Sequence, residues 1–281
     1  MTTVNKVKAN WWKVLVVALI TSVLSAMIHA LLPTGSSSLP PSIFVEKGLL
    51  PIVFIIYGFI YYALLGYIFV IIQSKLNGSK LIKGLSYGIF FCIITFIIYF
   101  EPLPTTTTLS LTNMTWMVVD GIPYIILGVL LGRFLSTESK IQKPTKNYIS
   151  KKLLLLIPLI FLIGRLISYN IFHIVSRYNN NPLTTLIWVL IVGSVLAILY
   201  YYILRPSIIS TPKNTAIYFG IIFGIYIFMF NFAYALIVSI SYEGYIDFIL
   251  RTSMDVIFVT LAIFVFEFLN SRNKTLNKKD N

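Results

Sequence analysis

The sequence is poor in the side chains that most enzymes and metal sites need. It contains one cysteine, two histidines and nine acidic residues. A single cysteine excludes an internal disulfide, and two histidines without further ligands make a poor metal site. The sequence also lacks a His-Glu-x-x-His zinc motif, a Walker A loop, a Gly-x-Ser-x-Gly elbow and a paired acidic cluster for magnesium. We therefore expect no catalytic residues, no metal, no cofactor and no ATP-driven motor within this chain.

Charged residues are also scarce, and their scarcity excludes a soluble fold. They make up 11% of the chain, whereas 58% of the residues are hydrophobic and the mean hydropathy is +0.88. A helix needs about 20 mostly apolar residues to cross a bilayer. Eight such stretches occur, near 12–32, 51–73, 82–100, 115–135, 153–174, 183–204, 216–239 and 252–269. These runs are longer than β-barrel strands and do not alternate in polarity. The sequence therefore predicts an all-α polytopic membrane protein that contacts the lipid bilayer.

The positive charges predict the orientation of the chain. Of the 22 lysines and arginines, eighteen lie before the first span, in alternate loops or in the tail, three lie in the other loops, and Arg165 lies within a span. Short loops rich in lysine and arginine stay in the cytoplasm. We therefore expect a multi-pass protein of the cell (plasma) membrane with cytoplasmic N- and C-termini. Orientation and contact with anionic headgroups explain the net charge of +13, so it does not indicate nucleic-acid binding.

A pattern of small residues occurs once in each half of the chain. Small residues recur at every fourth position of one span, and an acidic residue opens the next. They are Gly84, Gly88 and Cys92 followed by Asp120, and Ala216, Gly220 and Gly224 followed by Asp255. Positions four apart share a helix face, where small side chains let two helices pack closely in lipid. We expect a four-helix repeat at 1–135, a basic cytoplasmic linker at 136–152, and a second, parallel repeat with a basic tail at 153–281.

Polar residues inside the spans are the candidates for a ligand site. They are Arg165, Asp120, Asp255 and Asn231. Each is costly in hydrocarbon unless it faces a partner or water. For Arg165, a functional ion pair and a structural ion pair both stay open. The two aspartates have a second explanation, because an acidic residue also stabilises the positive N-terminal end of a helix. The histidines, His29 and His173, are expected to be hydrogen-bonded or interfacial side chains.

A family resemblance rests on short glycine-based motifs. It is carried by the segment Lys80-Leu81-Ile82-Lys83-Gly84-Leu85-Ser86-Tyr87-Gly88, by Pro102-Leu103-Pro104, by Asp120 and by Gly128 through Gly132. This succession resembles the four-span inner-membrane proteins of the YagU type over residues 48–136, with a weaker echo at 182–270. Where those proteins tend to have a histidine after the acidic residue, this chain has Ile122 and Pro123. The resemblance implies an integral membrane protein.

Three functions are compatible with these features. The first is a small-solute or ion transporter, indicated by the parallel repeats and by Arg165 with the two aspartates. The second is a non-catalytic scaffold or subunit, which would be favoured if the strips of small residues faced outward and bound another membrane protein or a second copy of the chain. The third, a membrane-embedded enzyme, would need one cavity joining Asp120, Asp255 and a histidine. The sequence does not identify a substrate.

Overall fold

The described part of the chain is built from helices. The computed structural model describes residues 11–31, 40–102, 111–138, 151–205 and 211–277. The α-helices are α1 (Trp11–Ala30), α2 (Ile43–Glu46), α3 (Leu50–Ile72), α4 (Lys80–Ile98), α5 (Leu111–Leu135), α6 (Leu156–Asn170), α7 (Pro182–Leu199), α9 (Pro212–Ala233) and α10 (Tyr242–Asn277). Two 3-10 turns, η1 (Lys151–Leu155) and η3 (Tyr234–Leu236), and a π-helical turn, η2 (Tyr200–Leu204), extend them. Most of the predicted linker, residues 139–150, lies outside the described part.

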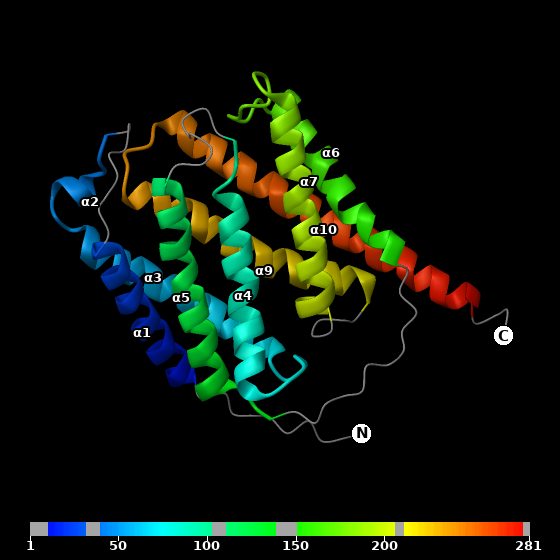
Figure 1. Cartoon of the computed structure of the whole chain (residues 1–281), viewed down its shortest axis with the longest axis horizontal. Helices are drawn as coiled ribbons and strands as arrows, with labels where there is room; N and C mark the ends of the chain where they lie inside the picture. The colour runs from blue at the N-terminus through cyan, green and yellow to red at the C-terminus, as the bar shows by residue number, and fades with distance from the viewer. Residues whose placement is uncertain (1–10, 32–39, 103–110, 139–150, 206–210, 278–281) are drawn as a thin grey trace.

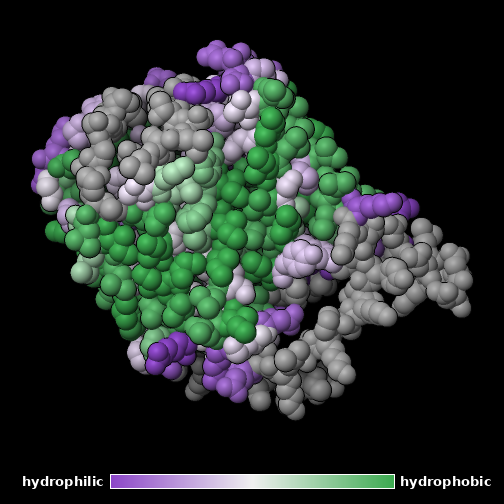
Figure 2. Space-filling view, viewed as in Figure 1, coloured by the Kyte–Doolittle hydropathy of each residue, from purple (hydrophilic) through white to green (hydrophobic). Residues whose placement is uncertain are grey.

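Eight of these helices are long and apolar enough to cross a membrane. This number confirms the expectation of a multi-pass membrane protein. Figure 2 shows a band of hydrophobic residues over the face formed by α1, α5, α4 and α7, with hydrophilic residues at its upper and lower margins. The last helix begins at Tyr242, ten residues before the predicted start at 252. The hydropathy pattern missed this first part because it contains Glu243, Asp247 and Arg251.

Local sequence sets where several helices begin. Asn181 accepts a hydrogen bond from the backbone N–H of Thr184 and precedes Pro182, the first residue of α7. Thr211 and Pro212 are arranged in the same way at the start of α9. A side-chain acceptor at the N-cap satisfies a free backbone donor, and proline at the next position has a backbone angle that suits the first turn. α7 begins one residue before its predicted start at 183, and α9 begins four residues before its predicted start at 216.

The helices pack in the same order in both parts of the chain, which we call the first half (residues 11–138) and the second half (residues 151–277). In the first half α1 packs on α3, α4 on α5, and α1 on α5. In the second half α6 packs on α7, α9 on α10, and α6 on α10. The halves meet where α3 contacts α9 and α4 contacts α7 (Figure 1). Each of these two helix contacts thus joins the second long helix of one half to the third of the other.

The small residues lie between paired helices of the same chain. A Cβ atom added at Gly84 would lie 2.6 Å from the backbone nitrogen and Cα of Gly132 on α5. Gly88 faces the backbone of α5 in the same way, and Cys92 lies against Gly121. In the second half Ala216 is buried, Gly220 faces Thr260 of α10, and Gly224 faces Val256. The α4–α5 pair therefore packs backbone against backbone, whereas α9 and α10 leave room for side chains.

Hydrogen bonds join the helix ends and the loops between them at both ends of the bundle. At the upper end in Figure 1, the backbone N–H of Ser42 donates to Ile237 O at 3.0 Å, and that of Arg177 donates to Pro102 O at 3.0 Å, so both bonds join the two halves. At the lower end, two sets of bonds between described residues each stay within one half. Gln73 accepts from Thr137 in the first half, and Glu267 accepts from Arg205 in the second.

Candidate functional site

Arg165 is buried toward the C-terminal end of α6 and is paired with two carboxylates. Its Nη1 donates to Glu101 Oε1 at 2.8 Å, and its Nη2 donates to Asp255 Oδ2 at 2.6 Å. Glu101 follows the end of α4, whereas Asp255 lies on α10. The pairing therefore joins α6 to the neighbouring helix of its own half and to the first half. Arg165 is 5% exposed and Asp255 is 5% exposed, so solvent screens this pairing little.

A second arginine shares the Glu101 carboxylate. Nη1 of Arg251 also donates to Glu101 Oε1, and its Nη2 donates to the Val175 carbonyl and to Asp247 Oδ2, the latter at 3.0 Å. Burial raises the pKa of Glu101, but Arg251 and Arg165 outweigh burial and hold this pKa below its usual value. Glu101 is thus a carboxylate at neutral pH. We call Arg165, Arg251, Glu101, Asp255 and Asp247 the arginine site.

Aromatic and amide side chains complete this site. The Arg165 guanidinium carbon lies 5.2 Å from the centre of a Trp188 ring, and cations are attracted to the faces of such rings. Asn231 of α9 donates from Nδ2 to Thr252 Oγ1 at 2.8 Å. Both Trp188 and Asn231 line a cavity of about 20 Å³ together with Arg165, Arg251, Glu101 and Asp255. A cavity of this size holds about one water molecule.

Two donors of the site have no partner. Among the residues that the structure describes, the Nε atoms of Arg165 and Arg251 are buried without a hydrogen-bond acceptor. Leaving a buried donor unpaired costs about 1–3 kcal/mol, and more for a charged group. The site therefore has unused capacity to bind an acceptor such as a water oxygen or an anion.

Three of the four predicted ligand residues lie at this site, and the fourth does not. Arg165, Asp255 and Asn231 line one cavity. Asp120 lies on α5, where its Oδ1 is 2.8 Å from Nε2 of His29 and its Oδ2 accepts from the Tyr99 hydroxyl. Helix capping is the wrong explanation for both aspartates. Asp120 is nine residues after the start of α5, and Asp255 is thirteen residues after the start of α10.

Glu101 and Arg251 were not among the predicted site residues because both lie outside the predicted spans, in predicted loops. A signal for Arg251 was present in the spacing Asp247, Arg251, Asp255, which puts alternating charges on one helix face. Glu101 carried no comparable signal, since only the tertiary structure brings the end of α4 to α6 and α10. The two histidines also differ. His29 is bonded within the bundle, whereas His173 is exposed after α6 and has a positive φ of 50°.

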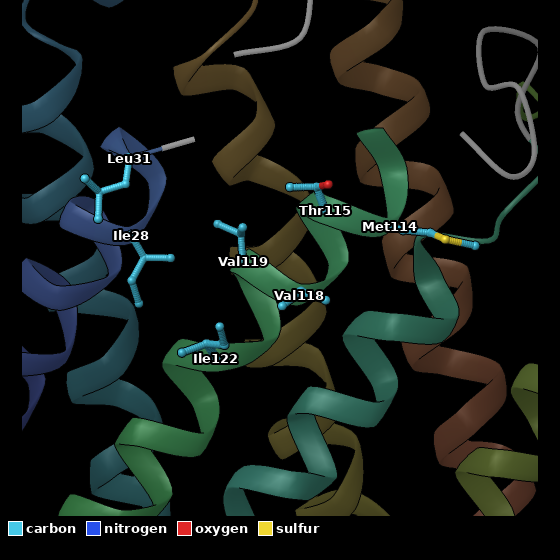
Figure 3. A pocket seen from close by; sticks show the side chains of 7 residues that line it. All are labelled: Ile28, Leu31, Met114, Thr115, Val118, Val119 and Ile122. Atoms are coloured by element: carbon cyan, nitrogen blue, oxygen red, sulfur yellow. The ribbon is translucent and has the colours of Figure 1, made fainter. Parts of the chain in front are cut away.

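A separate apolar groove opens on the surface between α1 and α5. Ile28 of α1, Leu31 just after it, and Val119 and Ile122 of α5 are among its lining residues (Figure 3), and its volume is about 490 Å³. The remaining lining residues are Met114, Thr115 and Val118. The groove forms part of the apolar surface that faces lipid, and its lining carries no charged side chain to orient a solute.

Other kinds of site find little support among the described residues. No group of three or more histidine, cysteine, aspartate and glutamate side chains within them could hold a metal ion. The cavity at Arg165 is lined by Asp255 but by neither Asp120 nor a histidine, so the arrangement that a membrane-embedded enzyme would need is not formed there. Comparisons of the chain with protein-family models, with curated proteins and with solved structures found no match.

Proposed function

We propose that this multi-pass membrane protein is a transporter of a small solute or ion, and that the arginine site is where the solute binds. One observation carries the proposal, which is that Arg165 and Arg251 line a cavity inside the helix bundle while retaining unpaired donors. Charged residues within spans are rare and mark solute pathways in membrane proteins. With two arginines around the cavity, a small anion is the first candidate. No catalytic step is part of this function.

The packing order supports a construction from two parallel four-helix repeats. The three packing pairs within the first half have counterparts within the second, and the α3–α9 and α4–α7 contacts correspond to each other, as expected if a twofold rotation relates the halves. Repeats with an even number of spans enter the membrane in the same direction, and solute sites of such transporters lie where the repeats meet. The arginine site fits this rule because Glu101 belongs to the first half, whereas Arg165 and Asp255 belong to the second.

Flux through purified protein in liposomes tests the proposal. We expect the wild-type protein to move at least one member of a panel of small ions that includes chloride, nitrate, sulfate, acetate, sodium and potassium. The double variant Arg165→Gln, Asp255→Asn should lose this flux, because it removes the charges of one ion pair while keeping similar side-chain volumes. Solute-specific electrodes and electrical recording on supported membranes would measure the flux.

The matched control for this experiment is Lys80→Gln, since Lys80 forms an exposed pair with Glu138 at 3.4 Å, far from the cavity. It should transport as well as the wild type. Both variants must elute as single species in size-exclusion chromatography, so that a loss of flux is not a loss of fold. Equal flux in the double variant and the wild type would contradict the assignment of the solute site.

Cysteine labelling tests the proposed orientation, with both termini in the cytoplasm. Asn77, between α3 and α4, and Asn180, between α6 and α7, are exposed. In a Cys92→Ser background, Asn180→Cys should react with a membrane-impermeant maleimide added to intact cells. Asn77→Cys should react only after the cells are opened. Labelling of both positions from the same side would contradict the alternation of the spans.

The scaffold alternative has lost its specific support. It was favoured if the strips of small residues faced outward, but Gly84 and Gly88 are covered by α5 and Gly220 is covered by α10. Copurification of the wild-type protein with another chain in fixed stoichiometry, together with absent flux, would restore it.

A further inference from the structure

His29 and Asp120 form a hydrogen-bonded pair that the arginine site does not use. Nδ1 of His29 lies 2.7 Å from the backbone oxygen of Ser25, which can only accept, so this nitrogen carries a hydrogen. Nε2 lies 2.8 Å from Asp120 Oδ1. A bond at this distance needs one proton between the two atoms, whether it belongs formally to the imidazole or to the carboxyl group. The pair as it stands in the structure therefore holds one exchangeable proton.

Loss of that proton would break the pair. A neutral imidazole that donates from Nδ1 has only a lone pair on Nε2, and an ionised carboxylate has only acceptors. These two groups repel each other at 2.8 Å, so they must separate. The proton leaves to water and no other bond changes. The pair is thus a two-state element, joined when the proton is bound and parted when it is released.

The last turn of α4 connects this pair to the arginine site. Tyr99, which follows α4, donates its hydroxyl hydrogen to Asp120 Oδ2. Two residues later, Glu101 accepts from Arg165 and Arg251. Trp188, beside Arg165, donates from Nε1 to the Ile97 carbonyl of the same turn at 3.0 Å. The end of α4 therefore contacts the Asp120 carboxylate through Tyr99 and the two arginines through Glu101.

The titratable and aromatic groups near the pair come from α3, α5, α9 and the residue after α4. Besides Asp120, α5 contributes the Trp116 ring, which lies 5.9 Å from the His29 ring. Of the tyrosines that interact electrostatically with Asp120, Tyr99 bonds to it directly, while Tyr62 of α3 donates to Ser25 Oγ and Tyr226 of α9 bonds to Thr95.

We propose that His29 and Asp120 form a proton-binding site, and that Tyr99 and the last turn of α4 transmit its occupancy to the arginine site. Release of the proton parts His29 from Asp120, and the carboxylate moves with the bound Tyr99 hydroxyl. This displaces the turn that carries Glu101. The inference rests on the proposed function in one respect, since it takes the arginine site as the solute site; the coupled ligand is then the proton, and transport is proton-dependent.

Two tryptophans of the native chain report on the two sites. Trp116 lies beside His29 and Trp188 beside Arg165, whereas Trp11 and Trp12 lie at the far end of α1. We would label the full-length protein with 5-fluorotryptophan, place it in lipid nanodiscs and record ¹⁹F NMR spectra from about pH 5 to 8, where histidine titrates. The Trp116 and Trp188 resonances should shift with one common midpoint, while those of Trp11 and Trp12 stay fixed.

Three variants separate the proton site from its coupling. His29→Gln should abolish the shift of both resonances, and Asp120→Asn should do the same if the first variant fails to fold. Tyr99→Phe should keep the shift of Trp116 and abolish that of Trp188, because it removes only the hydroxyl that links Asp120 to α4. His173→Asn is the histidine control, since His173 is exposed and asparagine tolerates its positive φ, and it should change neither shift.

Each other result counts against the inference. A Trp116 resonance that does not shift in the wild type would overturn the proton site. A Trp188 shift that persists in His29→Gln or in Tyr99→Phe, or that is absent in the wild type, would overturn the coupling. None of these spectra depends on flux. If the expected shifts occur but no solute crosses the liposome membrane, the transporter proposal fails and the proton site stands. If solute crosses but the resonances do not shift, the proton site fails and the transporter proposal stands.

Discussion

Gly84→Ala is expected to unfold or strongly destabilise the first half. The added Cβ atom would overlap the carbonyl oxygen of Gly128 and lie 2.6 Å from the backbone of Gly132. These are backbone atoms of α5, so no side chain can rotate away and the helices must move apart. Overpacking of a core typically costs about 1–3 kcal/mol and occasionally more. Because the Cβ atom clashes with the backbone of both Gly128 and Gly132, we expect a loss of stability at the upper end of this range. Thermal unfolding in detergent should show a much lower midpoint than for the wild type.

Gly224→Ala is the matched control. Gly224 occupies the corresponding strip in α9, but a Cβ atom there would lie 3.5 Å from the methyl groups of Val256, an ordinary contact distance. Alanine is also a better helix former than glycine by about 1 kcal/mol. This variant should unfold at the wild-type temperature or slightly above it. Equal losses of stability in the two glycine variants would mean that the strips do not differ in packing as described.

Arg165→Gln as a single substitution is expected to be the most destabilising change at the arginine site. It leaves the buried Asp255 carboxylate without its partner, while Glu101 keeps Arg251. Removing one partner of a buried ion pair costs about 3–5 kcal/mol, because the other charge stays in a medium of low polarity. Adding Asp255→Asn should recover much of the loss, since the remaining group is then neutral. Thermal unfolding of the single and double variants measures this difference.

Lys80→Gln again provides the comparison. The Lys80 and Glu138 side chains are 45% and 84% exposed, so their pair is solvated and worth little. The Lys80→Gln variant should therefore unfold at the same temperature as the wild type. If the double variant were no more stable than Arg165→Gln alone, the cost would lie in lost packing around Arg165 and not in the unpaired carboxylate of Asp255.

The sequence predicted the spans because hydrophobicity over 20 residues is a local property. It also predicted that Arg165 needs a carboxylate, backbone carbonyls or a cavity, since the cost of a charge in lipid does not depend on the fold. It could not choose between Asp120 and Asp255, because that choice depends on which helices meet. Glu101 was assigned to a loop for the same reason. Its burial between two arginines arises from the packing of α4 against the second half.

Tyr99 illustrates a different kind of limit. It is one of 18 tyrosines, and its residue type alone does not distinguish it from those that fill space. Its role in the proposed coupling follows from a position two residues before Glu101, where one hydroxyl reaches Asp120. The duplication and the YagU-type resemblance stay predictions. The packing order is consistent with the first, and the comparisons do not bear on the second.

The hydrogen bonds at the two ends of the bundle make its resistance to opening uneven. At the upper end, prising the halves apart would break the Ser42–Ile237 and Arg177–Pro102 bonds and the contacts of Glu101 with both arginines. At the lower end, the Gln73–Thr137 and Arg205–Glu267 bonds would all survive, because each closes within one half. Among the described residues, the two halves should therefore separate more easily at the lower end of the bundle than at the upper end.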